Sequence, residues 1–199
     1  MARKTDKRRE DLRIKLLDLA EAAIIDGGLD ALKARDLAKG AGCSVGAIYT
    51  VFGDLKDIVL AVNGRTFQRL GRDVAAAVQA KPDATPADQL VIMAMGYLDF
   101  AAGNTRAWRT LFDLEMSTEM SVPKWYLAEL GRLFSLISGP LRQVFPEKPE
   151  AEIDLMTRAL FSSVHGMVLL GLEQRISAIP RDEMEKMISF LLRTVAKPE

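Results

Sequence analysis

The chain has 199 residues, which is enough to bury a sizeable hydrophobic core in one large or two small domains. Lys plus Arg and Asp plus Glu each number 27, so the formal net charge is zero, which excludes a protein that binds polyanions with its whole surface. The single cysteine excludes an internal disulfide framework and is typical of a reducing compartment, so we expect a cytoplasmic protein.

The first 15 residues are basic. They hold seven Lys or Arg against three Asp or Glu, a net charge of +4, whereas the remaining residues hold 20 basic and 24 acidic side chains, a net charge of −4. This asymmetry is expected either for an arm that meets phosphate or for a solvated charged tail. No apolar stretch directly follows the basic residues, so we do not expect a signal peptide.

Apolar residues recur at helical spacing between Leu12 and Ile24 and predict a first helix. The glycine pair Gly27 and Gly28 is expected to end this helix, because glycine favours the conformations in which helices terminate.

The following stretch, residues 34–52 (ARDLAKGAGCSVGAIYTVF), has the pattern of a helix-turn-helix. Gly42 permits the positive φ that the turn requires, and Ser44 can cap the helix that follows. In the turn, Cys43 fits core packing better than a redox switch, because no second cysteine is present to form a disulfide with it. The second helix, 45–51, offers small outward side chains and one tyrosine, so we expect it to approach a DNA major groove closely.

The rest of the chain shows helical period and no long run of alternating polarity, so the predicted fold class is all-α. A long helix over about 54–80 contains Gly64 and Gly71, where bending or close packing is expected, and 81–86 forms a linker. Further helices are expected over 87–102, 105–116, 123–145, 150–176 and 181–196, with Pro140 kinking or interrupting its segment. The longest apolar run near the C-terminus, 166–172, is far shorter than the roughly 20 residues of a membrane span, so no membrane association is expected.

Residues 27–58 (GGLDALKARDLAKGAGCSVGAIYTVFGDLKDI) resemble the TetR family of transcriptional regulators. They carry its succession of a glycine, an R-D-[IL]-A helix, A-G-x-S and G-x-[IL]-Y-x-x-F. Residues 161–166 (FSSVHG) resemble the WHG type of C-terminal regulatory domain, with Phe161 where that signature has tryptophan. The resemblance implies a three-helix DNA-binding domain over 1–53, joined by a long helix to a larger helical ligand-binding and dimerisation domain over 54–199.

The resemblance also implies two kinds of contact with a double-stranded DNA operator. Contacts with phosphates, which set affinity and its salt dependence, are expected from Lys7, Arg8, Arg35 and Lys56. Two of the family's features are displaced here. Lys33 begins the second helix where a capping Thr or Ser is usual, and fits either beside a phosphate or in solvent. Lys56 stands one residue later than the family's lysine.

The recognition helix supplies the second kind of contact. Its expected DNA-facing residues are Ser44, Val45, Gly46, Ala47, Tyr49 and Thr50. The resemblance implies a backbone contact for Tyr49, whereas Val45, Ala47 and Thr50 can meet base edges or a thymine methyl group. The helix contains no Arg, Asn or Gln, so we expect methyl contacts and DNA shape to supply much of the specificity.

In the C-terminal body, the resemblance implies a pocket for a small effector, expected to be apolar or aromatic because few charged residues interrupt the lining. Its predicted lining residues are Trp108, Phe112, Met116, Phe161 and His165. His165 is either a hydrogen-bonded packing residue or a ligand contact. With one histidine and one cysteine, the chain has no zinc-type cluster and no catalytic constellation, so neither a metal nor a cofactor is expected.

The last two predicted helices indicate a homodimer. The first of them is apolar almost all round and must be covered on every side, either by a second copy or within the monomer. The expected interface residues are Ser163, Gly166, Leu170, Ile188, Leu191 and Leu192. The sequence thus favours a ligand-responsive homodimeric repressor. A helical partner-binding protein with a vestigial helix-turn-helix, or less readily a small-molecule enzyme, is the alternative.

Overall fold

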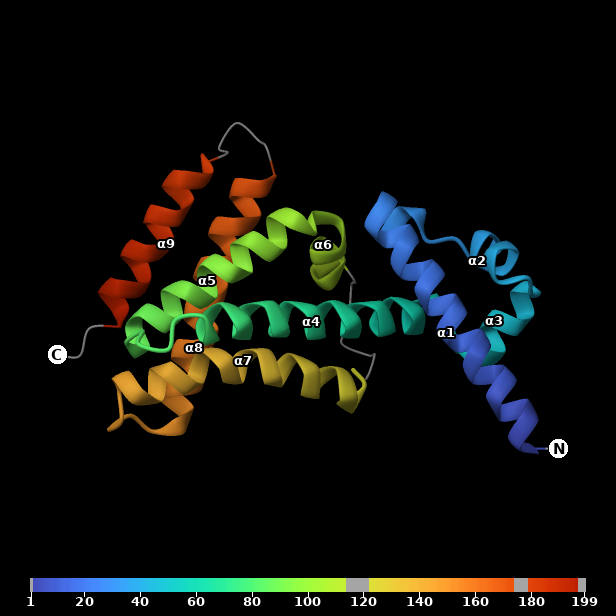
Figure 1. Cartoon of the computed structure of the whole chain (residues 1–199), viewed down its shortest axis with the longest axis horizontal. Helices are drawn as coiled ribbons and strands as arrows, with labels where there is room; N and C mark the ends of the chain where they lie inside the picture. The colour runs from blue at the N-terminus through green and yellow to red at the C-terminus, as the bar shows by residue number, and fades with distance from the viewer. Residues whose placement is uncertain (1, 114–121, 174–178, 197–199) are drawn as a thin grey trace. The chain divides into compact units, whose positions relative to one another are not determined.

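A computed structural model describes residues 2–113, 122–173 and 179–196, with side chains from Asp6 onward (Figure 1). Over these residues the chain is all-α, as predicted. The helices are α1 (Ala2–Gly27), the short 3₁₀ helix η1 (Leu29–Ala31), α2 (Ala34–Ala41), α3 (Val45–Val51), α4 (Leu55–Gln79), α5 (Pro86–Gly103), α6 (Thr105–Asp113), α7 (Lys124–Val144), α8 (Glu150–Leu172) and α9 (Arg181–Val195).

The chain divides into two compact units. Unit 1 comprises residues 1–66 and 104–126, and unit 2 comprises residues 67–103 and 127–199. The long helix α4 gives its first half to unit 1 and its second half to unit 2, and α6 belongs to unit 1 with α1 to α3. The two units are defined by packing alone. The division into a DNA-binding domain over 1–53 and a regulatory domain over 54–199 stays a prediction.

Unit 1 is built on one apolar stripe of α1. Leu16, Ala20 and Ile24, four residues apart, are fully buried and form a core with residues of α2, α3, α4 and α6. The helix ends where expected, because Gly28 takes a φ of 73°. It begins much earlier than predicted, at Ala2, so the basic N-terminal segment is helical rather than a separate arm.

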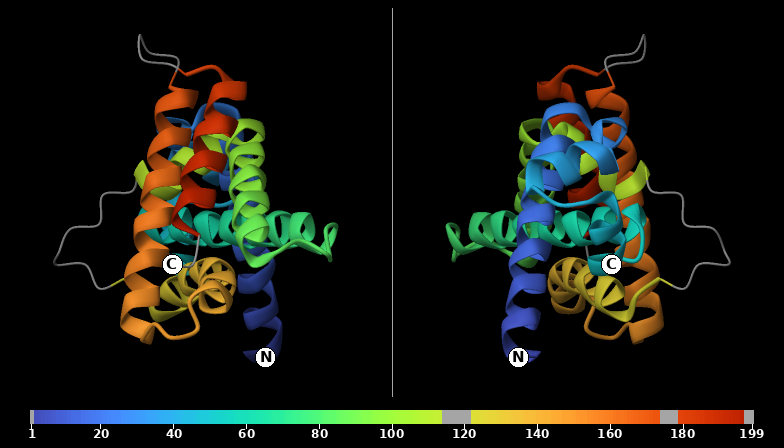
Figure 2. Two further views of the ribbon diagram at one scale, coloured as in Figure 1. Left: turned by 90° about the vertical axis from the view of Figure 1, so that its left-hand side faces the viewer. Right: turned by 90° about the vertical axis from the view of Figure 1, so that its right-hand side faces the viewer.

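Unit 2 contains α5, α8 and α9, which lie side by side (Figures 1 and 2). Two ion pairs fasten α9 to α5, one between Arg181 and Asp99 and one between Arg193 and Asp88 at 2.7 Å. A single stripe of α8 is buried, at Ile153, Thr157, Leu160, Val164 and Val168. In the described part of the chain, α8 alone has the length and apolar composition of a membrane span, a test that core helices of bundles also pass.

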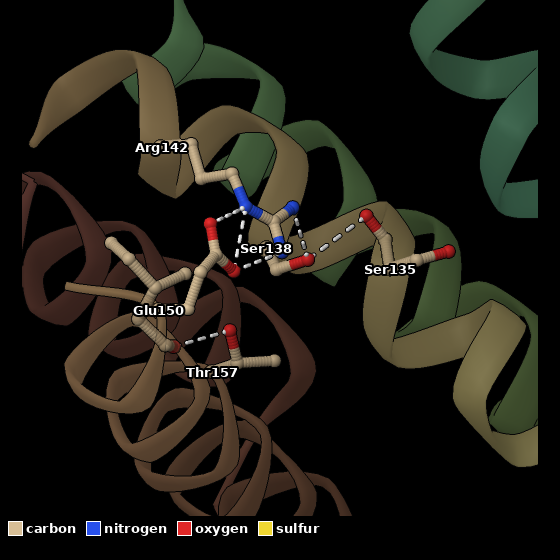
Figure 3. A network of polar contacts seen from close by, with 6 residues as sticks. Ser135, Ser138, Arg142, Glu150 and Thr157 are labelled. Atoms are coloured by element: carbon tan, nitrogen blue, oxygen red, sulfur yellow. Dashed lines mark hydrogen bonds and ion pairs between the residues drawn. The ribbon is translucent and has the colours of Figure 1, made fainter. Parts of the chain in front are cut away.

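A polar network joins the end of α7 to the start of α8 (Figure 3). The Arg142 guanidinium donates from Nε and Nη2 to the two carboxylate oxygens of Glu150, each at 2.8 Å. A third donor, Nη1, reaches the Ser138 hydroxyl at 2.9 Å. The hydrogen bonds from Arg142 lower the pKa of the Glu150 carboxyl. Helix α7 runs through Pro140, so the proline does not interrupt it.

The two glycines of α4 are sites of close packing. A Cβ atom at Gly64 would lie 2.9 Å from Trp125 Cζ3 in unit 1, and one at Gly71 would lie 3.2 Å from Leu133 Cδ2 in unit 2. Of the two expectations from the sequence, close packing therefore has structural support at both positions.

Candidate nucleic-acid interface and effector region

The turn between α2 and α3 is capped on both sides. Gly42 ends α2 in the left-handed region at φ 71°, and the Cys43 N–H donates to the Ala38 carbonyl at 3.0 Å. Ser44 begins α3, and its hydroxyl oxygen accepts from the Ala47 N–H at 3.2 Å. These are the two roles that the sequence predicts for Gly42 and Ser44, and they confirm the local geometry of a helix-turn-helix.

Helix α3 has a buried inner face and an exposed outer face. Ile48 is fully buried, and Phe52, directly after the helix, is 2% exposed; both belong to the core of unit 1. On the outer face Val45 is 36% exposed and Tyr49 is 44% exposed. Gly46 and Thr50 are also exposed, whereas Ala47 is half-buried. The predicted base-reading residues thus form most of the solvent-facing side of α3.

Thr50 is held by two hydrogen bonds to the protein. Its hydroxyl donates to the Gly46 carbonyl one turn earlier at 3.1 Å. Its own carbonyl accepts from Arg9 Nη2 at 3.0 Å. The C-terminal end of the recognition helix is therefore anchored to α1.

Two further basic side chains of α1 support the helix-turn-helix. Lys15 Nζ donates to the Ala41 carbonyl at the end of α2 at 3.0 Å. The Arg13 guanidinium lies 4.5 Å from the centre of the Phe52 ring. Cations at helix C-termini are favourable because of the helix dipole. Sequence reasoning counted Arg9, Arg13 and Lys15 only as N-terminal charge and missed this role.

The residues predicted to meet phosphate all lie at the surface of unit 1. Lys7 and Arg8 are exposed on α1, and Arg35 is exposed in the first turn of α2. Lys33 occupies the N-cap position of α2 with extended backbone and makes no side-chain capping bond. Lys56 is exposed in the first turn of α4. Their contacts with DNA stay predictions.

The first half of α4 is fastened to two neighbours within unit 1. Arg65 pairs with Asp18 at 2.6 Å and with Glu21 at 2.8 Å, both on α1. The Asn63 side-chain amide donates to the Thr110 carbonyl of α6 at 3.0 Å, and both residues are fully buried. The first half of α4 is thus joined by polar contacts to α1, the helix that carries Arg9, and to α6.

An aromatic cluster in unit 2 contains two of the predicted effector residues. The Tyr97 hydroxyl lies 2.8 Å from His165 Nδ1. Phe161 stacks on His165 with ring centroids 5.6 Å apart, and Phe134 meets Phe161 edge to face at 5.2 Å. Burial lowers the pKa of His165, which favours the neutral imidazole.

The other predicted effector residues belong to unit 1 or lie outside the described residues. Trp108 and Phe112 form an edge-to-face pair at 5.6 Å on α6, in unit 1, and Trp108 is fully buried. Met116 lies outside the described residues. Sequence reasoning did not single out Tyr97 and Phe134 for the pocket, because no periodic pattern relates Tyr97 to His165, 68 positions away.

The predicted dimer residues include exposed, half-buried and buried positions. Ser163 and Leu170 are exposed on α8, and Gly166 and Leu191 are half-buried. Ile188 is fully buried and Leu192 is 3% exposed within the chain itself. The prediction that Ile188 and Leu192 face a partner was therefore wrong, because this stripe of α9 packs inside unit 2.

The chain combines a capped helix-turn-helix, exposed basic side chains in the same unit and a helical C-terminal part. These features indicate the class of DNA-binding regulators with a helical C-terminal domain. Residues 16–62 match the family described as "Bacterial regulatory proteins, tetR family", and residues 90–195 match "Tetracyclin repressor-like, C-terminal domain". The chain belongs to the TetR family of transcriptional regulators, with a DNA-binding helix-turn-helix and a ligand-binding domain. The narrower WHG type of C-terminal domain stays a prediction.

Individual relatives agree with this assignment. The chain is 26% identical over 159 residues to the HTH-type transcriptional regulator BetI of Serratia proteamaculans, covering 79% of each chain. A solved protein of unknown function from Rhodococcus sp. RHA1 has a TM-score of 0.74 at 20% identity, over 92% of this chain and 94% of that chain. The transcriptional regulator FadR of Bacillus subtilis in complex with stearoyl-CoA has a TM-score of 0.67 at 16% identity, over 91% of this chain and 97% of that chain. These two structural likenesses show the fold alone.

Proposed function

We propose that the protein is a cytoplasmic homodimeric repressor that binds a pseudo-palindromic operator and leaves it when a small, largely apolar or aromatic effector binds. The outer face of α3 is the observation that carries the DNA-binding half of this proposal. It combines exposed Val45 and Tyr49 with a helix anchored at both ends, by Ser44 and by Arg9. Exposed Lys7, Arg8 and Arg35 in the same unit supply cations for phosphates.

A second copy is proposed to cover α8 and α9. Their surface carries large apolar side chains, among which Phe190 is 74% exposed and Leu155 is 67% exposed. Pairing both helices with their copies across a two-fold axis would form a four-helix interface. The two recognition helices would then lie about 34–36 Å apart, or a multiple of that distance, to enter successive major grooves.

The effector is proposed to bind near the aromatic cluster of Tyr97, Phe134, Phe161 and His165. The aromatic rings of Phe134 and Phe161, beside the paired Tyr97 hydroxyl and His165 imidazole, suit a small, largely apolar or aromatic molecule. The FadR structure holds stearoyl-CoA, a ligand that joins an apolar acyl chain to a charged coenzyme A group, so only its acyl part is of the kind proposed here. Such a ligand releases DNA only if it binds better to the conformer with low operator affinity.

The test is selection of bound duplexes from a random pool, followed by a screen for small molecules that release the selected duplex. We expect a sequence with two-fold symmetry, and a steep loss of affinity with salt that becomes shallower by about one unit of slope in Arg35→Ala. A chain that binds no duplex at any salt concentration would instead be a helical partner-binding protein.

A further inference from the structure

The helix-turn-helix contains three glycines, and the fold of the protein explains only two. A Cβ atom at Gly40 would lie 3.1 Å from Leu19 Cδ1, so close packing of α1 and α2 favours glycine there. Gly42 has a φ of +71°, which other residues rarely adopt. At Gly46, in the first turn of α3, φ is not positive, and a Cβ atom would meet only Ser44 Oγ, at 3.9 Å.

Gly46 is therefore a glycine that the protein itself does not require. An alanine would fit without a clash, and glycine is less stable than alanine in a helix. The residue is also exposed, on the outer face of α3. The missing Cβ leaves the helix backbone open to something that approaches from outside the protein.

Thr50 borders Gly46 one turn further along the same face. Its single hydroxyl proton is used in the bond to the Gly46 carbonyl at 3.1 Å. The hydroxyl oxygen can still accept a hydrogen bond, so Thr50 offers an acceptor and its γ-methyl group to the surface beside Gly46. Val45, exposed on the same turn as Gly46, adds further apolar surface.

We propose that Gly46 and Thr50 form an apolar notch that receives the C5-methyl group of a thymine in the major groove. The inference rests on the proposed binding of operator DNA. Thymine is the base that carries a methyl group at this edge, and the missing Cβ lets the helix approach it closely. Bidentate recognition of guanine uses Arg or Lys, and residues 45–51 contain neither.

Two variants test the notch on the selected operator. Gly46→Ala should melt at the same or a higher temperature than the wild type and yet bind the operator about tenfold more weakly, the cost of a lost base contact. Thr50→Val keeps a methyl group in place and should retain the sequence preference of the wild type. Its matched control, Thr50→Ser, keeps the hydroxyl but loses the methyl, and should lose that preference.

The DNA provides the complementary test. Replacing each thymine in turn by deoxyuridine removes only the C5-methyl group. We expect one position in each half-site where this change weakens wild-type binding about fivefold or more, and where it has no further effect on Thr50→Ser. The proposed notch is contradicted if deoxyuridine leaves the binding affinity unchanged at every position, or if Gly46→Ala binds the operator as tightly as the wild type. If the wild type binds no duplex at all, the proposed function fails, and the notch fails with it.

Discussion

Arg9 donates a hydrogen bond to the backbone carbonyl of Thr50, 41 residues further along the chain, at 3.0 Å. The bond ties the basic beginning of α1 to the last turn of the recognition helix. It places a cation where the helix dipole favours one. We therefore expect two separable uses of the N-terminal charge, because Arg9 is hydrogen-bonded to the protein and its exposed neighbour Arg8 is predicted to meet DNA.

Replacing Arg9 and Arg8 one at a time should separate these uses. We expect Arg9→Ala to lower the free energy of unfolding by about 0.5–1.5 kcal/mol, through the lost hydrogen bond and dipole interaction. Arg8→Ala is the matched control and should change stability by less than about 0.5 kcal/mol while weakening DNA binding at low salt. Chemical denaturation and salt titrations of binding measure both effects. Equal losses of stability in the two variants would contradict the assignment.

Ser44 should act through its capping bond to the Ala47 N–H. Ser44→Ala is expected to cost about 1 kcal/mol of stability, because the first turn of α3 loses its acceptor. Ser44→Asp retains an acceptor and should restore stability, but its charge should repel operator phosphates and weaken binding. Thermal melting and DNA titration of the pair distinguish the cap from the interface. A Ser44→Asp variant that binds DNA as tightly as the wild type would place Ser44 away from the phosphates.

The sequence predicts unit 1 better than unit 2, for a physical reason. The helix-turn-helix depends on local contacts, since Gly42 and Ser44 act on backbone groups within five residues of themselves. The Tyr97–His165 contact joins residues 68 positions apart and leaves no local signature. Likewise, helical period marks Ile188 and Leu192 as apolar, but cannot say whether their own chain or a second copy covers them.

Gly64 is a position where the structure refines the sequence-based expectation. Because a Cβ atom there would lie 2.9 Å from Trp125 Cζ3, Gly64→Ala should displace the Trp125 ring and cost about 1 kcal/mol or more. Gly131, in α7, is the control, since a Cβ atom there meets nothing within 4 Å. Gly131→Ala should be neutral or stabilise by up to about 1 kcal/mol.

A double variant checks the cause of the Gly64 effect. In a Trp125→Ala background, Gly64→Ala should cost much less than it does alone, because the clashing ring is absent. Denaturant unfolding of the four proteins in this cycle gives the coupling free energy. Additive losses would mean that bending of α4, rather than packing against Trp125, requires the glycine.

His165 should make stability depend on pH below neutrality. Burial lowers its pKa from 6.5 in the folded state, so the unfolded chain binds the proton more readily. The free energy of unfolding should therefore be constant above about pH 7.5 and fall as the pH drops through about 6.5. His165 is the single histidine of the chain, and Glu150 and Asp88, with lowered carboxyl pKa values, lose their contributions only under more acidic conditions. Thermal melting between pH 5.5 and 7.5 should show this dependence in the wild type and not in His165→Gln.

The exposed side of α9 provides the test of oligomeric state. Phe190 is 74% exposed while Ile188, two residues earlier, is fully buried, so the two positions separate a partner contact from a core contact. Phe190→Ser should shift sedimentation from dimer to monomer at micromolar concentration, because a large apolar side chain at an interface core is often a main source of binding energy. Ile188→Ala should instead lower the stability of the chain by about 2–5 kcal/mol, the cost of a core cavity. A wild-type monomer, or a Phe190→Ser variant that dimerises unchanged, would mean that α9 is not the dimer contact.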